Sequence, residues 1–386
     1  MDKIKYVNHV AQTTDNSPRK ASLTYQIMHK ERVVATISSR GEARVFDRKF
    51  LPYDLWLEEE NDFDNCLNNI NVFNHWCASR VLSLDRKYAK EIYNSLGFAQ
   101  ATTDKDRAKV SLSYHCVSLS DVFWVKTEEE EITFKELNLY DNPLNEAIVE
   151  LSLKGRQMTV TNQELAPDLS TKGCFPKAWI RESDGFVLLK DGGERSVKKE
   201  LLASRICQCF DIPQVVYKEH SYKGQLVTKS RIITTKDKSI VSRMAFDIYA
   251  ANHGLDTVEV SRTKDPITYY GMNILDYLVG NTDRHPENWG FWVDNETNDY
   301  LSLYPIMDFN ESFGSYDTLD GAMCQTVSER GVTQKEAAIE AVKHIGLPMK
   351  AEINEDIFEG FEEFSQEKEM FFLRLSELKR INKHDA

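Results

Sequence analysis

The sequence predicts an α+β protein with a β-rich lobe and a mainly helical lobe, preceded by an N-terminal α/β extension. Short strand-like segments separated by turn residues recur between residues 178 and 233. Beyond residue 239 the apolar residues instead recur at the 3.6-residue spacing of amphipathic helices. We therefore expect an N-terminal accessory region at 1–165, a β-rich lobe at 166–236 and a helical lobe at 237–386.

The composition is that of an ordinary globular chain that is long enough to bury a large core. The 386 residues are 41% hydrophobic and 28% charged. No apolar run is long enough to span a membrane, and the first residues lack the hydrophobic segment of a secretory signal. The seven cysteines show no metal-binding spacing and fit a reducing compartment, so we expect a cytoplasmic protein that has no membrane partner. A net charge of −13 argues against broad binding to nucleic acid, and we expect no direct nucleic-acid binding.

The accessory region begins with strand-like segments and continues with helical patterns. Gly41 lies in a plausible hairpin turn between two of the strands. We expect strands at 23–28, 33–37 and 43–46, helices at 63–76, 86–96 and 104–117, and an extended segment at 119–126.

The β-rich lobe is expected to contain four strands and one helix. Ser196 reads as the start of the helix, and the Asp211-Ile212-Pro213 segment as its end. We expect strands at 178–181, 186–189, 214–219 and 224–233, and the helix at 197–210.

The lysine that ends the second of these strands has an unusual position. Lys190 follows four apolar residues, and Glu200 lies in the next helix. A nearby carboxylate would let Lys190 stay charged, and such a lysine–glutamate pair orients an ammonium onto nucleotide phosphates. Alternatively, Lys190 reaches solvent from the strand end and Glu200 is unrelated to it.

Two further segments of this lobe are candidates for nucleotide contacts. The polar loop that contains Ser170, Thr171 and Gly173 leads into Lys177, and this loop can lie over phosphates. The backbone from Val227 through Lys229 is a candidate hinge that meets an adenine edge. A site at the junction of a β-rich and a helical lobe is a common place for a nucleotide.

The helical lobe contains the most informative stretch of the chain, residues 277–313. Helices are expected at 239–251, 269–279, 333–345 and 357–381, and between them two apolar ribbons, 289–293 and 300–307, flank a turn at 294–298. If the ribbons pair as antiparallel strands, their outer ends meet and bring Asn288 close to Asp308.

The polar residues at the outer ends of this hairpin suit phosphoryl transfer. Amide and carboxylate oxygens are ligands for Mg²⁺, which shares its shell with substrate phosphates. Asp283, five residues before Asn288, is then available to hold a proton-bearing nucleophile. The alternative is conformational, because Asp, Asn and Gly also gather in turns.

These motifs resemble those of the HipA-like branch of the protein-kinase-like fold and, more distantly, the phosphoinositide kinases. The signature stands here as Asp283-Arg284-His285-Pro286-Glu287-Asn288, followed by Met307-Asp308-Phe309-Asn310, in which asparagine replaces the glycine of the DFG-like pattern. The resemblance covers roughly residues 165–350 and implies a two-lobed kinase fold.

The resemblance also implies roles for individual residues. Asp283 becomes the catalytic base, His285 shapes the catalytic loop, and Asn288 and Asp308 hold Mg²⁺. Lys190, with Glu200 as its partner, becomes the lysine that contacts ATP.

The polar loop at the start of the β-rich lobe gains a role by the same resemblance. Gly173 and Lys177 fit the spacing of the family's phosphate-side loop. Ser170, with Thr171 as its neighbour, corresponds to a serine whose autophosphorylation ejects the loop and stops the kinase.

The implied activity is transfer of the γ-phosphoryl group of ATP to serine or threonine hydroxyls of a protein substrate. The resemblance further implies a toxin that is restrained by a small helix-turn-helix antitoxin. Three other functions stay open: a small-molecule or lipid kinase, a nucleotide-binding pseudokinase that acts as an interaction module, and a metal-dependent hydrolase. The hydrolase would use Asp283, His285 and Asp308, with His253 as the nearest further candidate ligand.

Overall fold

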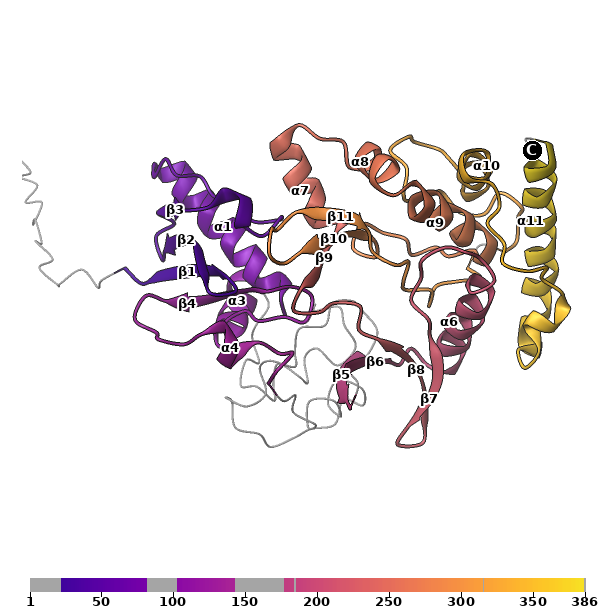
Figure 1. The fold of residues 1–386 in the computed structure, drawn as a ribbon, viewed down its shortest axis with the longest axis horizontal. Coiled ribbons are helices and arrows are strands. Elements are labelled where there is room, and N and C mark those ends of the chain that lie inside the picture. Colours follow the sequence, from indigo (N-terminus) through magenta and orange to yellow (C-terminus); the bar gives the residue numbers. More distant parts are fainter. Residues whose placement is uncertain (1–21, 82–102, 143–176, 184, 315, 385–386) are drawn as a thin grey trace, which may run out of the picture.

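The computed structural model describes residues 22–81, 103–142, 177–183, 185–314 and 316–384. In these residues three antiparallel sheets and a set of helices are arranged along the long axis of the molecule (Figure 1). The predicted α+β class is confirmed. The predicted helix at 86–96 and the loop residues Ser170, Thr171 and Gly173 lie outside the described residues.

The first sheet belongs to the N-terminal part of the chain. Its strand order is β3-β2-β1-β4, and the helix that follows β3 in the chain contributes Phe73 and Trp76 to a core shared with Ile27 and Val34. The elements are β1 (Thr24–His29), β2 (Arg32–Ser38), β3 (Ala43–Val45), η1 (Arg48–Phe50), α1 (Phe63–Ser79), α3 (Asp104–Leu112), β4 (Phe123–Thr127) and α4 (Phe134–Leu137).

The α3 helix is shorter than predicted. The sequence pattern extends to residue 117, but the helix ends at Leu112. His115 and Cys116 have positive φ angles of 61° and 57°, so the backbone there is left-handed and cannot continue a right-handed helix.

The second sheet has the strand order β5-β6-β8-β7. Its strands are β5 (Lys177–Glu182), β6 (Gly185–Lys190), β7 (Lys218–Tyr222) and β8 (Gln225–Arg231), and α6 (Glu194–Cys207) packs near β8. Two boundaries differ from the prediction. The N-cap of α6 is Gly193 and not Ser196. The strand β7 starts at Lys218 and not at Gln214, because Gln214 lies outside this sheet and forms a bridge with Ile306 instead.

The predicted hinge, from Val227 through Lys229, lies within a strand of this sheet. Val227 and Lys229 belong to β8, which lies between β6 and β7. Along β8, Val227 pairs with His220 of β7, while Lys229 pairs with both Leu189 of β6 and Lys218 of β7. This backbone is therefore used for sheet hydrogen bonds, and the assignment of Val227 and Lys229 to ATP contacts stays a prediction.

The third sheet, in the order β11-β10-β9, lies beside the helices of the C-terminal part. Residues 239–242 form most of β9 and not the predicted helix, because they pair with β10, and α7 begins only after Ser242 as its N-cap. The elements are β9 (Lys238–Ser242), α7 (Arg243–His253), α8 (Thr257–Lys264), α9 (Pro266–Val279), β10 (Gly290–Asp294), β11 (Tyr300–Leu303), α10 (Gln334–Ile345), η3 (Glu355–Phe358), η4 (Glu362–Phe364) and α11 (Ser365–His384).

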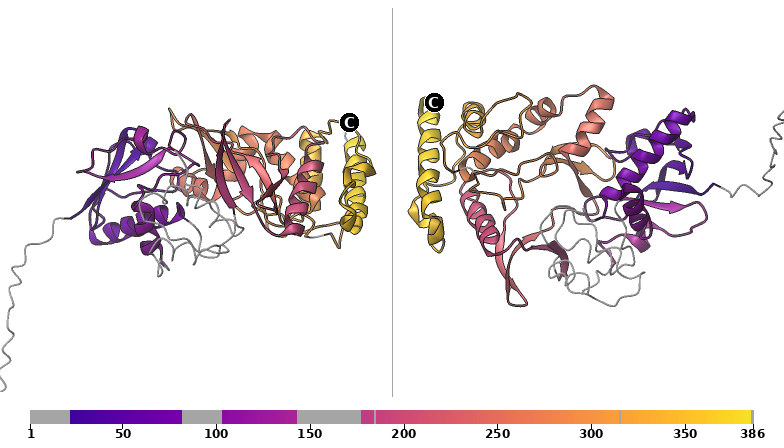
Figure 2. Two further views of the ribbon diagram at one scale, coloured as in Figure 1. Left: turned by 90° about the horizontal axis from the view of Figure 1, so that it is seen from below. Right: turned by 180° about the vertical axis from the view of Figure 1, so that it is seen from behind.

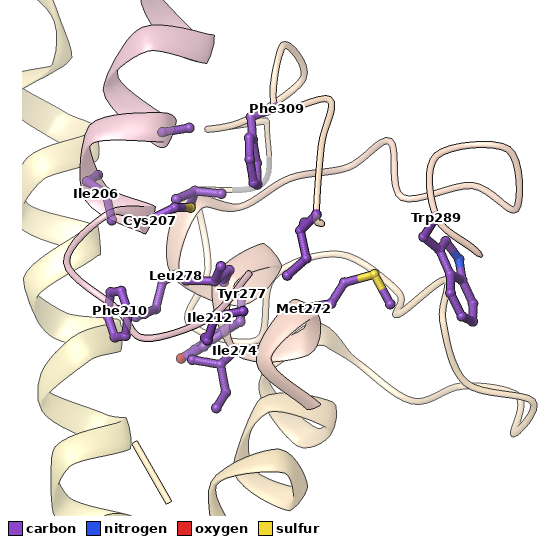
Figure 3. Packing of buried hydrophobic residues seen from close by; sticks show 14 of the residues in the cluster. Ile206, Cys207, Phe210, Ile212, Met272, Ile274, Tyr277, Leu278, Trp289 and Phe309 are labelled. Carbon is purple, nitrogen blue, oxygen red and sulfur yellow. The ribbon is translucent and has the colours of Figure 1, made fainter. Parts of the chain in front are cut away.

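The α9 helix is the centre of the largest core. Every residue from Thr268 to Val279 is buried. Figure 3 shows Tyr277 and Leu278 of α9 in the middle of the cluster, with Ile206 of α6 on one side and Met272 on the side of Trp289. The core therefore joins α6 directly to the C-terminal helices, and the N-terminal sheet lies at the opposite end of the molecule from α11 (Figure 2). No helix among the described residues is long and apolar enough to cross a membrane.

Candidate active site

The β10–β11 hairpin brings the two halves of the predicted site together. Phe291 pairs with Leu303 in antiparallel register, and the Tyr304 N–H donates to the Gly290 carbonyl at 3.0 Å. The chain that enters β10 and the chain that leaves β11 therefore run side by side. The convergence of the segments around Asn288 and Asp308 follows from this pairing.

Arg284 connects the two segments through their backbones. Its Nη1 donates to the carbonyl of Asn288 at 3.2 Å and to the carbonyl of Met307. The guanidinium is buried and forms a two-pronged ion pair with Asp276 of α9, in which both N–O distances are 2.9 Å. A buried charge needs such a partner, and this one holds the hairpin ends on the central helix.

Sequence reasoning assigned no role to Arg284 or Asp276. A usable signal was present, since Asp276 is a carboxylate within the otherwise apolar segment Ile274–Val279. Such a residue in a buried helix requires a cationic or hydrogen-bonding partner. Asn281 also donates to Asp276, at 3.1 Å, and its Nδ2 lies 3.4 Å from the Asp308 carbonyl.

Lys190 is the centre of a buried polar cluster. Its ammonium donates to Glu200 Oε1 at 3.1 Å, to Asn310 Oδ1 at 3.0 Å and to Asp308 Oδ1. Lys190 is only 6% exposed and Glu200 1%. Thr228 of β8 donates to the second oxygen of Glu200 at 2.7 Å, which fixes that carboxylate. The alternative, in which Lys190 extends into solvent beside an unrelated glutamate, does not match this geometry.

The charges of this cluster stabilise one another. Burial alone would raise the pKa of Asp308, but the ammonium groups of Lys190 and Lys177 outweigh it and lower the pKa to about 2. Burial likewise works against the charge on Lys190, yet Asp308 and Glu200 raise its pKa above the ordinary value. Asp308 and Lys190 are therefore both charged at neutral pH.

Asp283 lies at the more open edge of the site, with 39% of its side chain exposed. Its backbone is fixed on both sides: its N–H donates to Asn281 Oδ1 at 3.2 Å, and its carbonyl accepts from Asn288 Nδ2 at 2.7 Å. Burial raises the pKa of its carboxyl, while His285, whose Nε2 lies 3.7 Å away, has the opposite effect. The carboxylate is thus held beside the cluster and still accessible to a substrate hydroxyl.

The oxygen atoms of Asn288 and Asp308 suit one divalent cation whose remaining coordination positions are filled by a bound ligand and water. The amide nitrogen of Asn288 is occupied by the Asp283 carbonyl, which leaves its Oδ1 as the atom for a cation. Asp308 supplies a carboxylate that is charged at neutral pH. Within the described ranges, no group of three or more His, Cys, Asp or Glu residues could hold a metal by itself. Two oxygen ligands with room for phosphates and water are typical of Mg²⁺ sites.

The remaining predicted residues divide into three groups. Lys177 is the first residue of β5 and pairs with Lys190, which places it beside the cluster. Val227 and Lys229 lie within β8 as described, and the Lys229 ammonium pairs with Glu182 at 2.5 Å. His253 packs against Tyr249 at the end of α7 and is exposed, so it takes no part in the site.

No protein-family model matches the chain, and no curated protein matches its sequence. The chain is similar to a chain in the solved structure of the Shewanella oneidensis MR-1 toxin–antitoxin system of HipA, HipB and operator DNA. The identity is 11%, the match covers 93% of this chain and 99% of that chain, and the TM-score is 0.53. It is also similar to the Helicobacter pylori proinflammatory kinase CtkA, with 16% identity, 53% of this chain and 90% of that chain covered, and a TM-score of 0.39. The Shewanella match extends over nearly the whole of both chains, and the predicted two-lobed fold of the HipA type is confirmed.

Proposed function

We propose that this protein is an ATP-dependent kinase that phosphorylates serine or threonine hydroxyls of a protein substrate. The observation that carries the proposal is the buried contact of Lys190 with both Glu200 and Asp308. A strand lysine, a helix glutamate and an aspartate after a hairpin form the constellation on which phosphoryl transfer depends. The HipA-type fold supports the same class of reaction.

Each residue of the site has its own role in the proposed phosphoryl transfer. Asp283 orients the substrate hydroxyl and accepts its proton. The Lys190 ammonium, held by Glu200, neutralises charge on the phosphates during transfer, and Lys177 adds a second positive charge nearby. His285 limits the freedom of the Asp283 carboxylate. Most of the rate enhancement comes from this positioning and from fixed charges.

ATP and Mg²⁺ are the implied cofactors. Asn288 and Asp308 would hold the metal ion, which supplies electrostatic stabilisation of the phosphates when bound. The loop residue Gly173 would approach the phosphates through its backbone.

Regulation and partners are part of the proposal by analogy with the HipA fold. Ser170, or its neighbour Thr171, would be the autophosphorylation site. The Shewanella protein was solved with HipB and operator DNA, which supports a small antitoxin as a partner of this chain. Direct contact of this chain with nucleic acid is not part of the proposal, because its net charge is −13.

The proposal is tested by incubating the full chain with magnesium and ATP labelled at the γ-phosphate. Asp283→Ala should reduce phosphate incorporation about 100-fold or more, because a positioned base contributes at least that factor. Asp211→Ala, which changes an exposed aspartate beyond the end of α6, is the matched control and should retain full incorporation.

Mass spectrometry of the products separates the alternatives. Phosphate on Ser170 or Thr171 supports the protein kinase. Nucleotide binding without transfer by the wild type would indicate a pseudokinase. Phosphorylation of a metabolite but of no protein would indicate a small-molecule kinase, and phosphate release from a substrate without ATP would indicate a hydrolase.

A further inference from the structure

Tyr217 lies directly before β7, outside the motifs that the sequence singles out, and its side chain reaches the candidate site. Its hydroxyl oxygen accepts a hydrogen bond from the Asp308 N–H at 3.0 Å. The side chain is buried, and its ring meets the Phe309 ring edge-on with 6.4 Å between the centroids. A buried tyrosine hydroxyl is therefore in direct contact with the backbone of the aspartate at the centre of the polar cluster.

The segment that leads to Tyr217 runs parallel to the chain that leaves β11. The Ile306 N–H donates to the Pro213 carbonyl at 3.0 Å, and the Val215 N–H donates to the Ile306 carbonyl at 2.8 Å. These two bonds form a short parallel ladder. Two residues further on, the Asp308 N–H donates to the Tyr217 hydroxyl. The side chain of Tyr217 thus extends this ladder to Asp308.

Tyr217 is itself fixed by α6. Its backbone N–H donates to Ser204 Oγ at 3.0 Å, and Ser204 is fully buried in α6. The same helix carries Glu200, which accepts from Lys190. One helix therefore sets the position of two groups that act on Asp308, the Lys190 ammonium and the Tyr217 hydroxyl.

Asp308 needs such support because of its backbone conformation. Its φ of 63° is left-handed, which costs free energy in any residue except glycine and persists only where the surroundings hold it. Tyr217 binds the N–H of Asp308, and Asn281 Nδ2 lies 3.4 Å from its carbonyl. Contacts on both sides of the Cα atom fix the direction of the side chain. Lys190 then bonds Oδ1, which leaves the second carboxylate oxygen for a cation.

We propose that Tyr217 is a positioning residue for the metal ion. By holding the Asp308 N–H, its hydroxyl keeps the carboxylate in the orientation in which Asp308 and Asn288 bind Mg²⁺. Hydrogen-bond partners of metal ligands commonly contribute about 10-fold or more to metal affinity. The inference rests on the proposed function for the role of Asp308 as a ligand, and it adds the group that keeps this ligand in place.

The test is a titration of the full chain with Mn²⁺, a paramagnetic substitute for Mg²⁺, without nucleotide. Electron paramagnetic resonance measures the free Mn²⁺. Tyr217→Phe removes only the hydroxyl and should weaken Mn²⁺ binding about 10-fold. The matched control is Tyr114→Phe in the N-terminal part, which removes the hydroxyl of a similarly buried tyrosine that donates to the Arg80 carbonyl at 3.1 Å. It should bind Mn²⁺ like the wild type.

A second pair of measurements separates positioning from a general loss of structure. Urea unfolding in EDTA should show a cooperative transition for both phenylalanine variants, so that weaker binding is not a result of unfolding. In the phosphate-transfer assay, Tyr217→Phe should need about 10-fold more magnesium for half of its maximal rate and should keep the wild-type rate at saturating magnesium. A purely structural role would not move the magnesium dependence in this way.

The possible outcomes distinguish this inference from the proposed function. Equal Mn²⁺ affinity of wild type and Tyr217→Phe overturns the inference and leaves the kinase proposal standing. Equal weakening in Tyr114→Phe also overturns it, because the loss then follows from packing and not from the contact with Asp308. If the wild type itself binds no Mn²⁺, Asp308 is not a metal ligand, and the metal site of the proposed function fails together with the role of Tyr217.

Discussion

At the scale of residues, Asp283 and Asp308 belong to one site, yet their pKa values are shifted in opposite directions. Burial raises the pKa of Asp283. Burial also acts on Asp308, but Lys190 and Lys177 reverse its effect and lower the pKa to about 2. The difference follows from distance to the ammonium groups, since Asp308 contacts Lys190 directly.

These shifts predict opposite effects of two similar substitutions on stability. The folded-state pKa of Asp308 is below its unfolded value of 3.8, so its charge stabilises the fold above that pH, and this contribution disappears as the pH falls toward 2. The folded-state pKa of Asp283 is above its unfolded value, so its charge destabilises the fold at neutral pH, and this cost disappears in acid. At pH 7, Asp308→Asn should therefore lower the free energy of unfolding, by about 2 kcal/mol, and Asp283→Asn should raise it.

Urea unfolding at pH 7 and pH 3 in the presence of EDTA measures both effects without metal. The Asp308→Asn difference should shrink at pH 3, and Asp211→Asn, at an exposed position, should show little change at either pH. Changes of the same sign in the two site variants at pH 7 would contradict the electrostatic account.

Asn310 shows why residue roles are hard to derive from a motif alone. A glycine at this place in the DFG-like pattern suggests a need for backbone freedom, but the left-handed conformation belongs to Asp308, with a φ of 63°. Asn310 instead uses its side chain to accept from Lys190 and its carbonyl to accept from Ser196 at 3.3 Å. The sequence could predict Lys190 with Glu200, because a charged residue ending an apolar strand requires a partner. It could not predict Asn310, whose partner is 120 residues away.

At the scale of elements, local patterns predicted the hairpin and most helices, and long-range pairing explains what was missed. The segment Ser239–Ser242 contains Ile240 and Val241 between serines and fits either a short strand or the start of a helix. Pairing with β10 decides in favour of a strand. This pairing depends on Gly290, because a Cβ there would lie 2.0 Å from the Val241 carbonyl oxygen. A single sequence does not show which glycine has such a neighbour.

The turn between β10 and β11 is anchored to the N-terminal part by one residue. Asn298 has a φ of 55°, and its Nδ2 donates to the carbonyls of Lys49 and Leu51 at 2.8 and 3.1 Å. Its own carbonyl accepts from the Tyr53 hydroxyl at 2.8 Å. The far end of the hairpin that carries the site is therefore held by the accessory region.

We expect Asn298→Gly to lower the free energy of unfolding by about 1–3 kcal/mol, because glycine keeps the left-handed backbone and loses both side-chain hydrogen bonds. Asn298→Ala should cost about 1 kcal/mol more, since alanine is strained at this φ. Urea denaturation measures both. The control is Lys223→Gly at the tip of the β7–β8 turn, where φ is 49°, and its effect should be small. If Asn298→Gly is as stable as the wild type, the turn is not an anchor.

At the scale of the whole molecule, the N-terminal part is integrated with the part that carries the candidate site. The division at residues 165 and 236 was drawn from changes in sequence pattern, and such changes do not show how the parts pack. Tyr53 belongs to the same core as α9, and its ring lies 4.8 Å from Tyr249 and 5.9 Å from Phe246 between centroids. Ion pairs of Lys30 with Glu296 and of Lys49 with Asp299 also join the N-terminal part to the segment around the β10–β11 turn.

This packing predicts that the accessory region stabilises the part of the molecule that carries the candidate site. Tyr53→Ala should lower the free energy of unfolding by about 3–5 kcal/mol, the cost of removing a large buried aromatic side chain. Phe63→Ala is the matched control, since its side chain is largely exposed and its loss should change stability by about 0.5 kcal/mol or less. Hydrogen exchange locates the effect: in Tyr53→Ala, amides of α7 and of the β10–β11 hairpin should lose protection, because Phe246 and the Asn298 turn lose their partner, while α11 at the far end keeps its protection (Figure 1). If only the N-terminal sheet loses protection, the two parts are stable independently, and the accessory region has no role in holding the β10–β11 hairpin.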